Sequence, residues 1–327
     1  MAATPGAPTV SSPAGAQPGA AAGAPAGAPA AGGPRGARGL HLPAIPAPWI
    51  FSALLTLILV VGQYYFRIVG GYERLAVALG TAIGVELLLS RLLRGRWPNI
   101  LSAYISGNSI AILTKPAASL LWPFALGSAL AISSKYVLTY RGRHLWNPTN
   151  FAISAMLLAA PGSMAILSHQ WGNHPSAVAI VFIVGLMVVW RARLLHITGT
   201  YLVCFVALAA LRSAINGQPL AAEVAPVTGP MYTLLMFFML TDPRTVVSTR
   251  RGRVVVVVLI ALLECAIRLL PLVNVPVLEP LLWAPPIFAL AIIGPIAKWL
   301  DIRRTTTPRG AAVAPAAVVP GGAAAPA

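Results

Sequence analysis

A succession of long apolar stretches, separated by short connections that carry most of the arginines, restricts this chain to one class of fold. A helix needs about 20 apolar residues to cross a lipid bilayer. Charged residues make up 9% of the chain, whereas a water-soluble domain carries about 25%. So few charges cannot cover a surface that faces water. The sequence therefore predicts an all-α protein that crosses the bilayer several times.

Ten apolar stretches are expected to be helices, two of them short. They cover residues 49–66, 74–93, 99–114, 117–138, 147–167, 174–190, 194–212, 228–241, 254–271 and 278–298. The flanking residues 1–48 and 302–327 are rich in Ala, Pro and Gly, from which no core can form. We expect them to be disordered tails around a membrane domain at residues 49–301.

The basic residues indicate the orientation of these helices. If the N-terminus lies inside, most of the 23 lysines and arginines fall in the inner loops and the two tails. The outer ends receive only Arg67, Arg74, Lys115, Arg212 and Arg268. Because short inner loops of membrane proteins are enriched in Lys and Arg, we expect both termini in the cytoplasm of a bacterial cell, beneath its inner (plasma) membrane. The same rule explains the net charge of +16 without a nucleic-acid partner.

Two similar helix ends suggest an internal repeat. The third expected helix ends in AILTKP (Ala111–Pro116) and the eighth in FMLTDP (Phe238–Pro243). Ten helices divide into two sets of five, at about residues 49–167 and 174–298, and the two motifs then end on opposite sides of the membrane. This is the arrangement of a 5+5 inverted repeat with two short broken helices.

Broken helices within a membrane often build a binding site, because their free backbone groups need protein or water partners. Thr114 and Lys115 at one break, and Thr241 and Asp242 at the other, are therefore candidate binding residues. The alternative is an ordinary helix end, with Asp242 as a solvated charge.

Asparagines open the fifth expected helix from the inner side. Asn147 and Asn150 flank a proline, and such amides either cap a helix or hold the polar edge of a ligand ring. Thr241 and Asp242 end the eighth helix on the same side, so the two motifs could share one cavity.

Three ionisable residues, Glu86, Lys135 and Glu264, fall inside expected helices, where such groups usually face the bundle interior or water. Glu86 and Glu264 are candidates for an ion pathway. Alternatively, Glu264 forms a structural pair with Arg268 four residues later. The alternative for Lys135, which lies near a helix end, is that it extends toward the interface.

No soluble catalytic constellation is present, so we expect at most a subunit of a membrane enzyme. Cys204 and Cys265 each stand alone in an apolar segment, and the sequence contains no Cys-x-x-Cys pair. We therefore expect neither a catalytic residue nor a metal site.

Three stretches carry a family resemblance. They are SSKYVLTYRGRHLWNPTNFAI at Ser133–Ile153, LLMFFMLTDPRTVVSTRRGRVV at Leu234–Val255 and PPIFALAIIGPIAKWLD at Pro285–Asp301. Together they resemble the RnfD and NqrB membrane subunits of ion-pumping ferredoxin:NAD and NADH:quinone oxidoreductases. Within that group they are most similar to the RnfD-like (UnbU-type) proteins encoded beside enediyne biosynthesis genes. The resemblance implies a ten-helix inverted repeat, electron or redox-coupled ion transport, and partner subunits with further redox centres.

In RnfD and NqrB, FMN is esterified to the threonine of a Ser-Gly-Ala-Thr-like motif before the sixth helix. The corresponding stretch here, APGSMAILSHQWGNHPSA at Ala160–Ala177, contains no threonine. Covalent FMN is therefore not expected, and any FMN or riboflavin would be bound noncovalently. Two other functions remain open: an inverted-repeat transporter of a small solute without redox chemistry, and a membrane scaffold that binds no small molecule.

Overall fold

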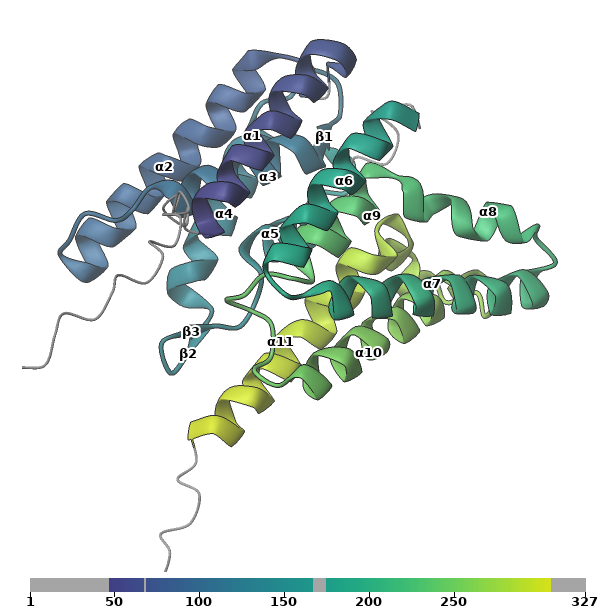
Figure 1. Cartoon of the computed structure of the whole chain (residues 1–327). Coiled ribbons are helices and arrows are strands. Elements are labelled where there is room, and N and C mark those ends of the chain that lie inside the picture. The colour runs from purple at the N-terminus through teal and green to yellow at the C-terminus, as the bar shows by residue number, and fades with distance from the viewer. Residues whose placement is uncertain (1–46, 68, 167–174, 307–327) are drawn as a thin grey trace, which may run out of the picture. The chain divides into compact units, whose positions relative to one another are not determined.

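The computed structural model describes residues 47–67, 69–166 and 175–306, and within these ranges the chain is mostly helical (Figure 1). Nearly all of both expected tails lies outside the described residues. The last helix nevertheless continues to Thr306 and so includes five residues that were expected to belong to the C-terminal tail. Its final turn carries Arg303 and Arg304, which are favourable at the negative end of the helix dipole.

The first half of the described chain holds five helices and four short strands. They are α1 (Ala47–Phe66), α2 (Tyr72–Arg94), α3 (Leu101–Leu113), β1 (Thr114–Pro116), α4 (Trp122–Val137), β2 (Thr139–Tyr140), β3 (Arg143–His144), α5 (Pro148–Ala159) and β4 (Met164–Ile166).

The second half has helices joined by loops and no strand among its described residues, and several of its helices are short. They are α6 (Pro175–Arg191), α7 (Leu195–Asn216), α8 (Leu220–Val224), the 3-10 helix η1 (Ala225–Thr228), α9 (Pro230–Leu234), the π-helix η2 (Leu235–Met239), α10 (Arg250–Arg268), the 3-10 helices η3 (Leu270–Leu272) and η4 (Pro276–Trp283), and α11 (Pro285–Thr306). Each of the ten expected stretches overlaps one or more of the helices in the two halves.

Four helices in the described part of the chain are long and apolar enough to cross a membrane, namely α2, α7, α10 and α11. A fifth crossing results if the bent pair Leu220–Thr228 and Met231–Met239, with an angle of 61° between its parts, is counted as one span. The apolar helices α3 and α5 are shorter than a span. Length and composition thus indicate a polytopic membrane protein.

The fifth expected helix is shorter than predicted. Residues 147–167 were expected to be one helix, but α5 ends at Ala159 and a turn leads into β4. Pro161 and Gly162 follow directly, and neither favours continuation of a helix. β4 then pairs antiparallel with β1, with Thr114 opposite Ile166. The pairing gives hydrogen-bond partners to the extended backbone that follows the end of α3.

The two halves pack in a similar order. In the first half, α2 contacts α3 and α4, α4 contacts α5, and α1 contacts α3. In the second half, α7 contacts η2 and α10, α10 contacts α11, and α6 contacts α9 and η2. Two of the contacts between the halves join segments that have the same position in each half. The first segments, α1 and α6, lie against each other, and so do the fifth segments, α5 and α11.

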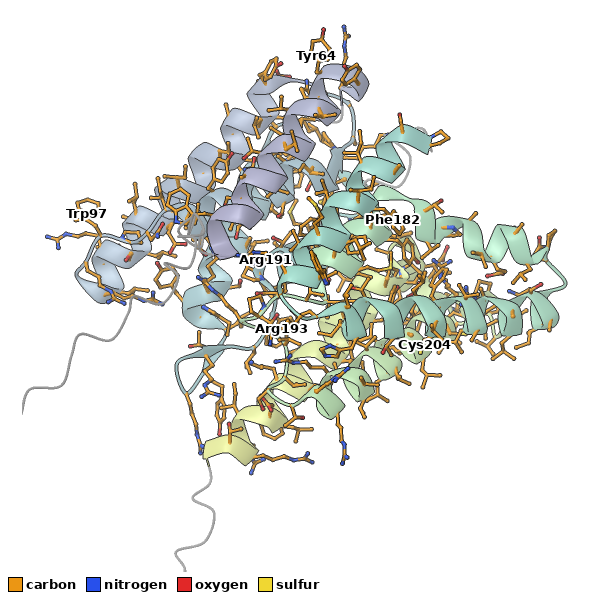
Figure 2. All side chains as sticks on the ribbon, viewed as in Figure 1. Tyr64, Trp97, Phe182, Arg191, Arg193 and Cys204 are labelled. Carbon is orange, nitrogen blue, oxygen red and sulfur yellow. The ribbon has the colours of Figure 1, made fainter. Side chains whose placement is uncertain are left out.

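Many large apolar side chains point away from the helices (Figure 2). Tyr64 and Trp97, labelled there, are 80% and 71% exposed. Leu186 and Met187 on α6 and Val203 on α7 are also exposed. In water such a surface would be costly, whereas lipid tails are as apolar as these side chains. The exposed surface is therefore compatible with a lipid bilayer around the helices.

Candidate functional site

A cavity of about 690 Å³ lies between elements of the two halves. Its walls come from α1, α3 and α5 on one side, and from α6, η2 and the loop after η2 on the other. Lining residues occur along the whole of α3, from Asn99 just before it to Leu113 at its end. At 1.5 Å per residue, the wall formed by α3 is about 18 Å long. The cavity is therefore long enough to hold an extended small molecule.

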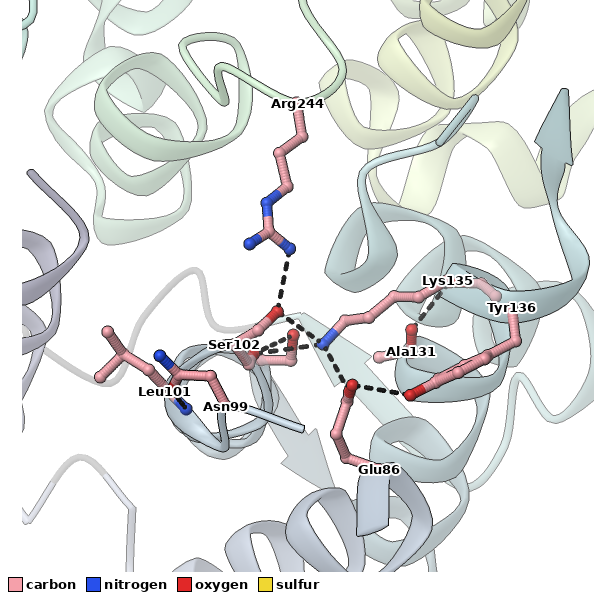
Figure 3. A network of polar contacts seen from close by, with 10 residues as sticks. Glu86, Asn99, Leu101, Ser102, Ala131, Lys135, Tyr136 and Arg244 are labelled. Atoms are coloured by element: carbon pink, nitrogen blue, oxygen red, sulfur yellow. Dashed lines mark hydrogen bonds and ion pairs between the residues drawn. The ribbon is translucent and has the colours of Figure 1, made fainter. Parts of the chain in front are cut away.

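The two ends of the cavity differ in polarity. Ser102, Lys135 and Arg244 lie together at the end where α3 begins (Figure 3). Ile112 and Leu113 line it where α3 ends. The cavity thus presents a cationic, hydrogen-bonding end and an apolar end, as a site for an amphiphilic ligand does.

Asn147 and Asp242 meet at this cavity, as the sequence motifs suggested. The Nδ2 atom of Asn147 donates to Oδ2 of Asp242 over 3.1 Å. Asn147 also caps α5, because its Oδ1 accepts from the backbone nitrogen of Asn150 at 3.1 Å. One side chain therefore begins a helix in the first half and holds a loop of the second half.

Asp242 organises the loop after η2. Its Oδ1 accepts from the backbone nitrogen of Arg244 at 3.0 Å, and its Oδ2 accepts from the hydroxyl of Thr245 at 3.1 Å. With the bond from Asn147, the carboxylate has three partners, so it is not simply a solvated charge. Thr241 is buried and donates its hydroxyl to the carbonyl of Phe237 at 2.5 Å. Both residues line the cavity, and Asp242 holds the backbone of Arg244 beside it.

Lys135 is buried inside the bundle rather than extended toward the interface. Its ammonium lies 3.3 Å from Oε2 of Glu86 and donates to the carbonyl and Oγ of Ser102 at 3.2 and 3.1 Å (Figure 3). Tyr136 donates to Oε1 of the same carboxylate at 2.9 Å. The ion pair with Glu86 and the two bonds to Ser102 offset part of the cost of burying the charge.

His144 reaches the cavity because of a tight hairpin. β2 and β3 pair through a two-residue turn in which Arg141 and Gly142 have φ of 51° and 74°. Two positive φ values favour glycine and match the twist of a hairpin. Burial, together with the nearby charge of Arg244, lowers the pKa of His144 below its usual value. Its buried Nδ1 has no hydrogen-bond partner among the described residues.

The remaining binding candidates lie outside this cavity. Asn150 donates to the carbonyl of Ile287 in α11 at 2.9 Å, and it lines a smaller pocket beside the cavity. Thr114 is buried just beyond Leu113, in β1, and its hydroxyl has no partner among the described residues. Lys115 is exposed. The structure therefore brings together Asn147, Thr241 and Asp242 but not the other three.

Glu264 belongs to a second buried cluster, in the other half. Its carboxylate accepts from the hydroxyls of Tyr201 and Tyr232, both at 2.5 Å. Arg268 pairs with it at 3.1 Å, as the spacing of four residues predicted, and also donates to Tyr232. Glu264 is 1% exposed. The structural pair is confirmed, whereas a role in ion transport stays a prediction for Glu264 and for Glu86.

Ser102, His144 and Arg244 were not predicted as site residues. Arg244 follows the Thr-Asp-Pro motif directly, so its position beside Asp242 was a signal that could have been used. Ser102 and His144 gave no comparable signal, because their roles depend on contacts with residues distant in sequence.

Among the described residues, no three His, Cys, Asp or Glu side chains are grouped as a metal ion would require. Comparisons with family models and with curated proteins found no match to this chain.

Proposed function

We propose that this chain is an RnfD/NqrB-like membrane subunit of an electron-transport or redox-coupled ion-transport system in a bacterial plasma membrane. The observation that carries the proposal is the hydrogen bond between Asn147 and Asp242. These residues belong to Ser133–Ile153 and Leu234–Val255, two of the stretches on which the resemblance rests. If the two stretches resemble the family because they form its binding site, they should meet in space at a cavity. The contact between Asn147 and Asp242 agrees with this expectation.

The packing order of the helices supports a 5+5 inverted repeat with ten membrane segments. The distribution of Lys and Arg along the sequence supports both termini in the cytoplasm. Segments with the same position in each half make similar contacts, and α1 with α6 and α5 with α11 join the halves. Such a correspondence in packing is what a pseudo-twofold axis in the membrane plane would produce.

The cavity fits a noncovalently bound flavin. Sites for cofactors of this size have volumes of about 300–1,000 Å³ and mostly apolar walls with a few polar groups. Phe237 and Phe238 contribute aromatic walls, and Asn147 offers an amide for the polar edge of a ring. The unpartnered Nδ1 of His144 is a further polar atom in the lining. FMN or riboflavin would therefore have aromatic walls for its ring and polar groups for its ring edge, without a threonine ester.

A bound flavin would supply one- and two-electron transfer chemistry. The residues of the chain would hold the ring by Asn147 and the apolar wall, and the loop of Asp242 would keep Arg244 at the cavity. Partner subunits would carry the other redox centres.

The test is the absorbance and fluorescence of the detergent-purified full chain, expressed with ample riboflavin, before and after acid denaturation. We expect a flavin spectrum that passes into the supernatant on denaturation. Asp242→Ala should lower the flavin content, because the loop loses its three hydrogen bonds, whereas Glu279→Gln, at an exposed position away from the cavity, should not. Colourless wild-type protein would contradict the proposal. Fluorescence that stays with the polypeptide would contradict noncovalent binding.

A transporter for a small solute is the second candidate. It is favoured by the position of the cavity between two halves with similar packing, since two such halves can rock around a central site. Solute uptake by proteoliposomes that contain colourless protein would support this function. Uptake equal to that of empty liposomes would count against it.

A further inference from the structure

Positive charge is concentrated on the walls of the cavity. Four of its lining residues are cationic, namely Lys135, Arg191, Arg244 and Arg253. Asp242 is the one acidic residue in the lining. Cavities with low-dielectric walls and one sign of charge concentrate ions of the opposite sign.

Two of these cations are already used by the fold. Arg253 donates from Nε to the carbonyl of Val247 at 2.9 Å and from an Nη atom to that of Ser248 at 3.3 Å. Arg191 stands at the C-terminal end of α6, where the helix dipole favours a cation. The fold therefore accounts for these two arginines without a ligand. Their charges still add to the positive electrostatic potential in the cavity.

Arg244 is not explained in this way, and Lys135 only in part, because its ion pair with Glu86 does not account for its approach to Arg244. Both donate to the same atom, Oγ of Ser102, from 3.1 and 3.2 Å (Figure 3). Two cations that converge on one neutral oxygen repel each other, and solvent reduces this repulsion on the side of Arg244, which is exposed. Glu86 neutralises Lys135 on the far side, but Asp242 binds the backbone nitrogen of Arg244 and not its guanidinium. An anion beside Ser102 would relieve this repulsion.

The donors needed for an anion are present. A guanidinium has five N–H groups, and the structure gives that of Arg244 one side-chain partner among the described residues, Ser102. Arginine binds phosphate and carboxylate groups with two parallel hydrogen bonds. The neighbouring His144 carries its unpartnered Nδ1 at the same cavity, and either a neutral or a protonated imidazole can donate to an anion.

We infer that this end of the cavity is an anion site formed by Arg244, Lys135 and Ser102, and that it takes the phosphate or carboxylate head of a ligand whose apolar body extends along α3 toward Ile112 and Leu113. The inference deepens the proposed function in using the same cavity. Applied to a flavin, it selects FMN over riboflavin. The same head chemistry exists in anionic lipids, so the test must separate the two sources.

FMN and riboflavin are a matched pair of probes, because they share one ring system and differ by a phosphate. The full chain in detergent is titrated with each, with flavin fluorescence as the readout. A charged hydrogen bond contributes about 1.5–3 kcal/mol, so FMN should bind roughly tenfold or more tightly than riboflavin. Arg244→Gln should remove most of that preference. Arg251→Gln, an exposed arginine outside the cavity, should keep it.

Lipid is tested by repeating the FMN titration in nanodiscs of phosphatidylcholine alone or with phosphatidylglycerol. Weaker FMN binding with phosphatidylglycerol, abolished by Arg244→Gln but not by Arg251→Gln, supports an anion site that lipid headgroups also enter. Unchanged binding supports a site that selects the soluble anion.

The two proposals fail in different ways. Equal affinities of the wild-type protein for FMN and riboflavin would overturn the anion site and leave a flavin subunit standing. If neither flavin binds, dodecyl phosphate is titrated by calorimetry. Binding that is lost in Arg244→Gln would keep the anion site and refute the flavin. No binding of dodecyl phosphate would overturn the anion site as well.

Discussion

Glu86 and Lys135 form an ion pair of 3.3 Å between α2 and α4, and both side chains are buried. Removal of one partner of a buried pair leaves an uncompensated charge and typically costs about 3–5 kcal/mol. We therefore expect Lys135→Met to lower the thermal stability of the detergent-purified protein strongly. The double variant with Glu86→Gln should recover much of the loss, because no buried charge then remains. A double variant less stable than either single one would refute this account of the pair.

The cluster around Glu264 should be equally sensitive. Glu264→Gln keeps the shape of the side chain but leaves the Arg268 guanidinium without its carboxylate and changes the bonds to Tyr201 and Tyr232. We expect a loss of about 3 kcal/mol or more in unfolding free energy, measured in detergent with a chemical denaturant. Glu279→Gln, at an exposed position, serves as the control and should change the free energy little. Equal effects of the two substitutions would contradict a structural role of the cluster.

The approach of α6 to the π-helix depends on one glycine. A Cβ atom at Gly185 would clash with the ring of Phe237, which packs edge-on against Phe182 at 5.4 Å between ring centroids. Gly185→Ala should therefore cost about 1–3 kcal/mol, as overpacking does. Gly199→Ala in α7 meets open space and should instead stabilise its helix, by up to about 1 kcal/mol. Thermal unfolding of both variants makes the comparison, and a stabilised Gly185→Ala would show that the two elements do not pack closely.

The two roles of Asn147 can be separated. Asn147→Ala removes the cap of α5 and should cost about 1 kcal/mol. Asn147→Ser retains a capping oxygen and should restore most of that stability. Neither residue can donate to Asp242 as the amide does, so both variants should bind FMN more weakly than the wild type. If serine restored binding together with stability, the contact with Asp242 would have no part in the site.

Acid should destabilise the region of the hairpin through His144. Its pKa is lower in the folded protein than in the unfolded chain, so the unfolded state takes up a proton first as the pH falls. Stability should therefore decline below about pH 6.5, the usual pKa of histidine. Arg244, Lys135 and Arg94 add to this effect, and Asp242 opposes it. His144→Asn should flatten the decline between pH 7 and pH 5, as seen in thermal unfolding. An unchanged slope would exclude His144 as its source.

The sequence was sufficient to predict the position of every major helix, because apolar runs and their arginine-rich ends are local signals. It also predicted the cap at Asn147 and its nearness to Asp242. Thr-Asp-Pro and Asn-Pro both mark helix ends, and the orientation rule placed those ends on one side. These features follow from short stretches of sequence and a single assumption about topology.

Contacts between distant segments were not accessible in the same way. The pairing of β1 with β4 depends on two broken ends meeting in space, and neither strand of three residues has a pattern of its own. The burial of Lys135 depends on Glu86 and Ser102, which lie on other helices. The contact of Arg244 with Ser102 joins residues 142 positions apart, and no local pattern in the sequence indicates it.

The π-helix at Leu235–Met239 changes the direction in which the residues after it point around the helix axis. A π-turn holds one residue more than an α-turn, and one residue corresponds to a rotation of about 100° around a helix axis. If one residue were removed from this segment, the rest could continue as a regular α-helix. Thr241 and Asp242 would then face a different direction, away from Asn147. The extra residue thus acts as an angular offset that aims the Thr-Asp-Pro motif at the cavity.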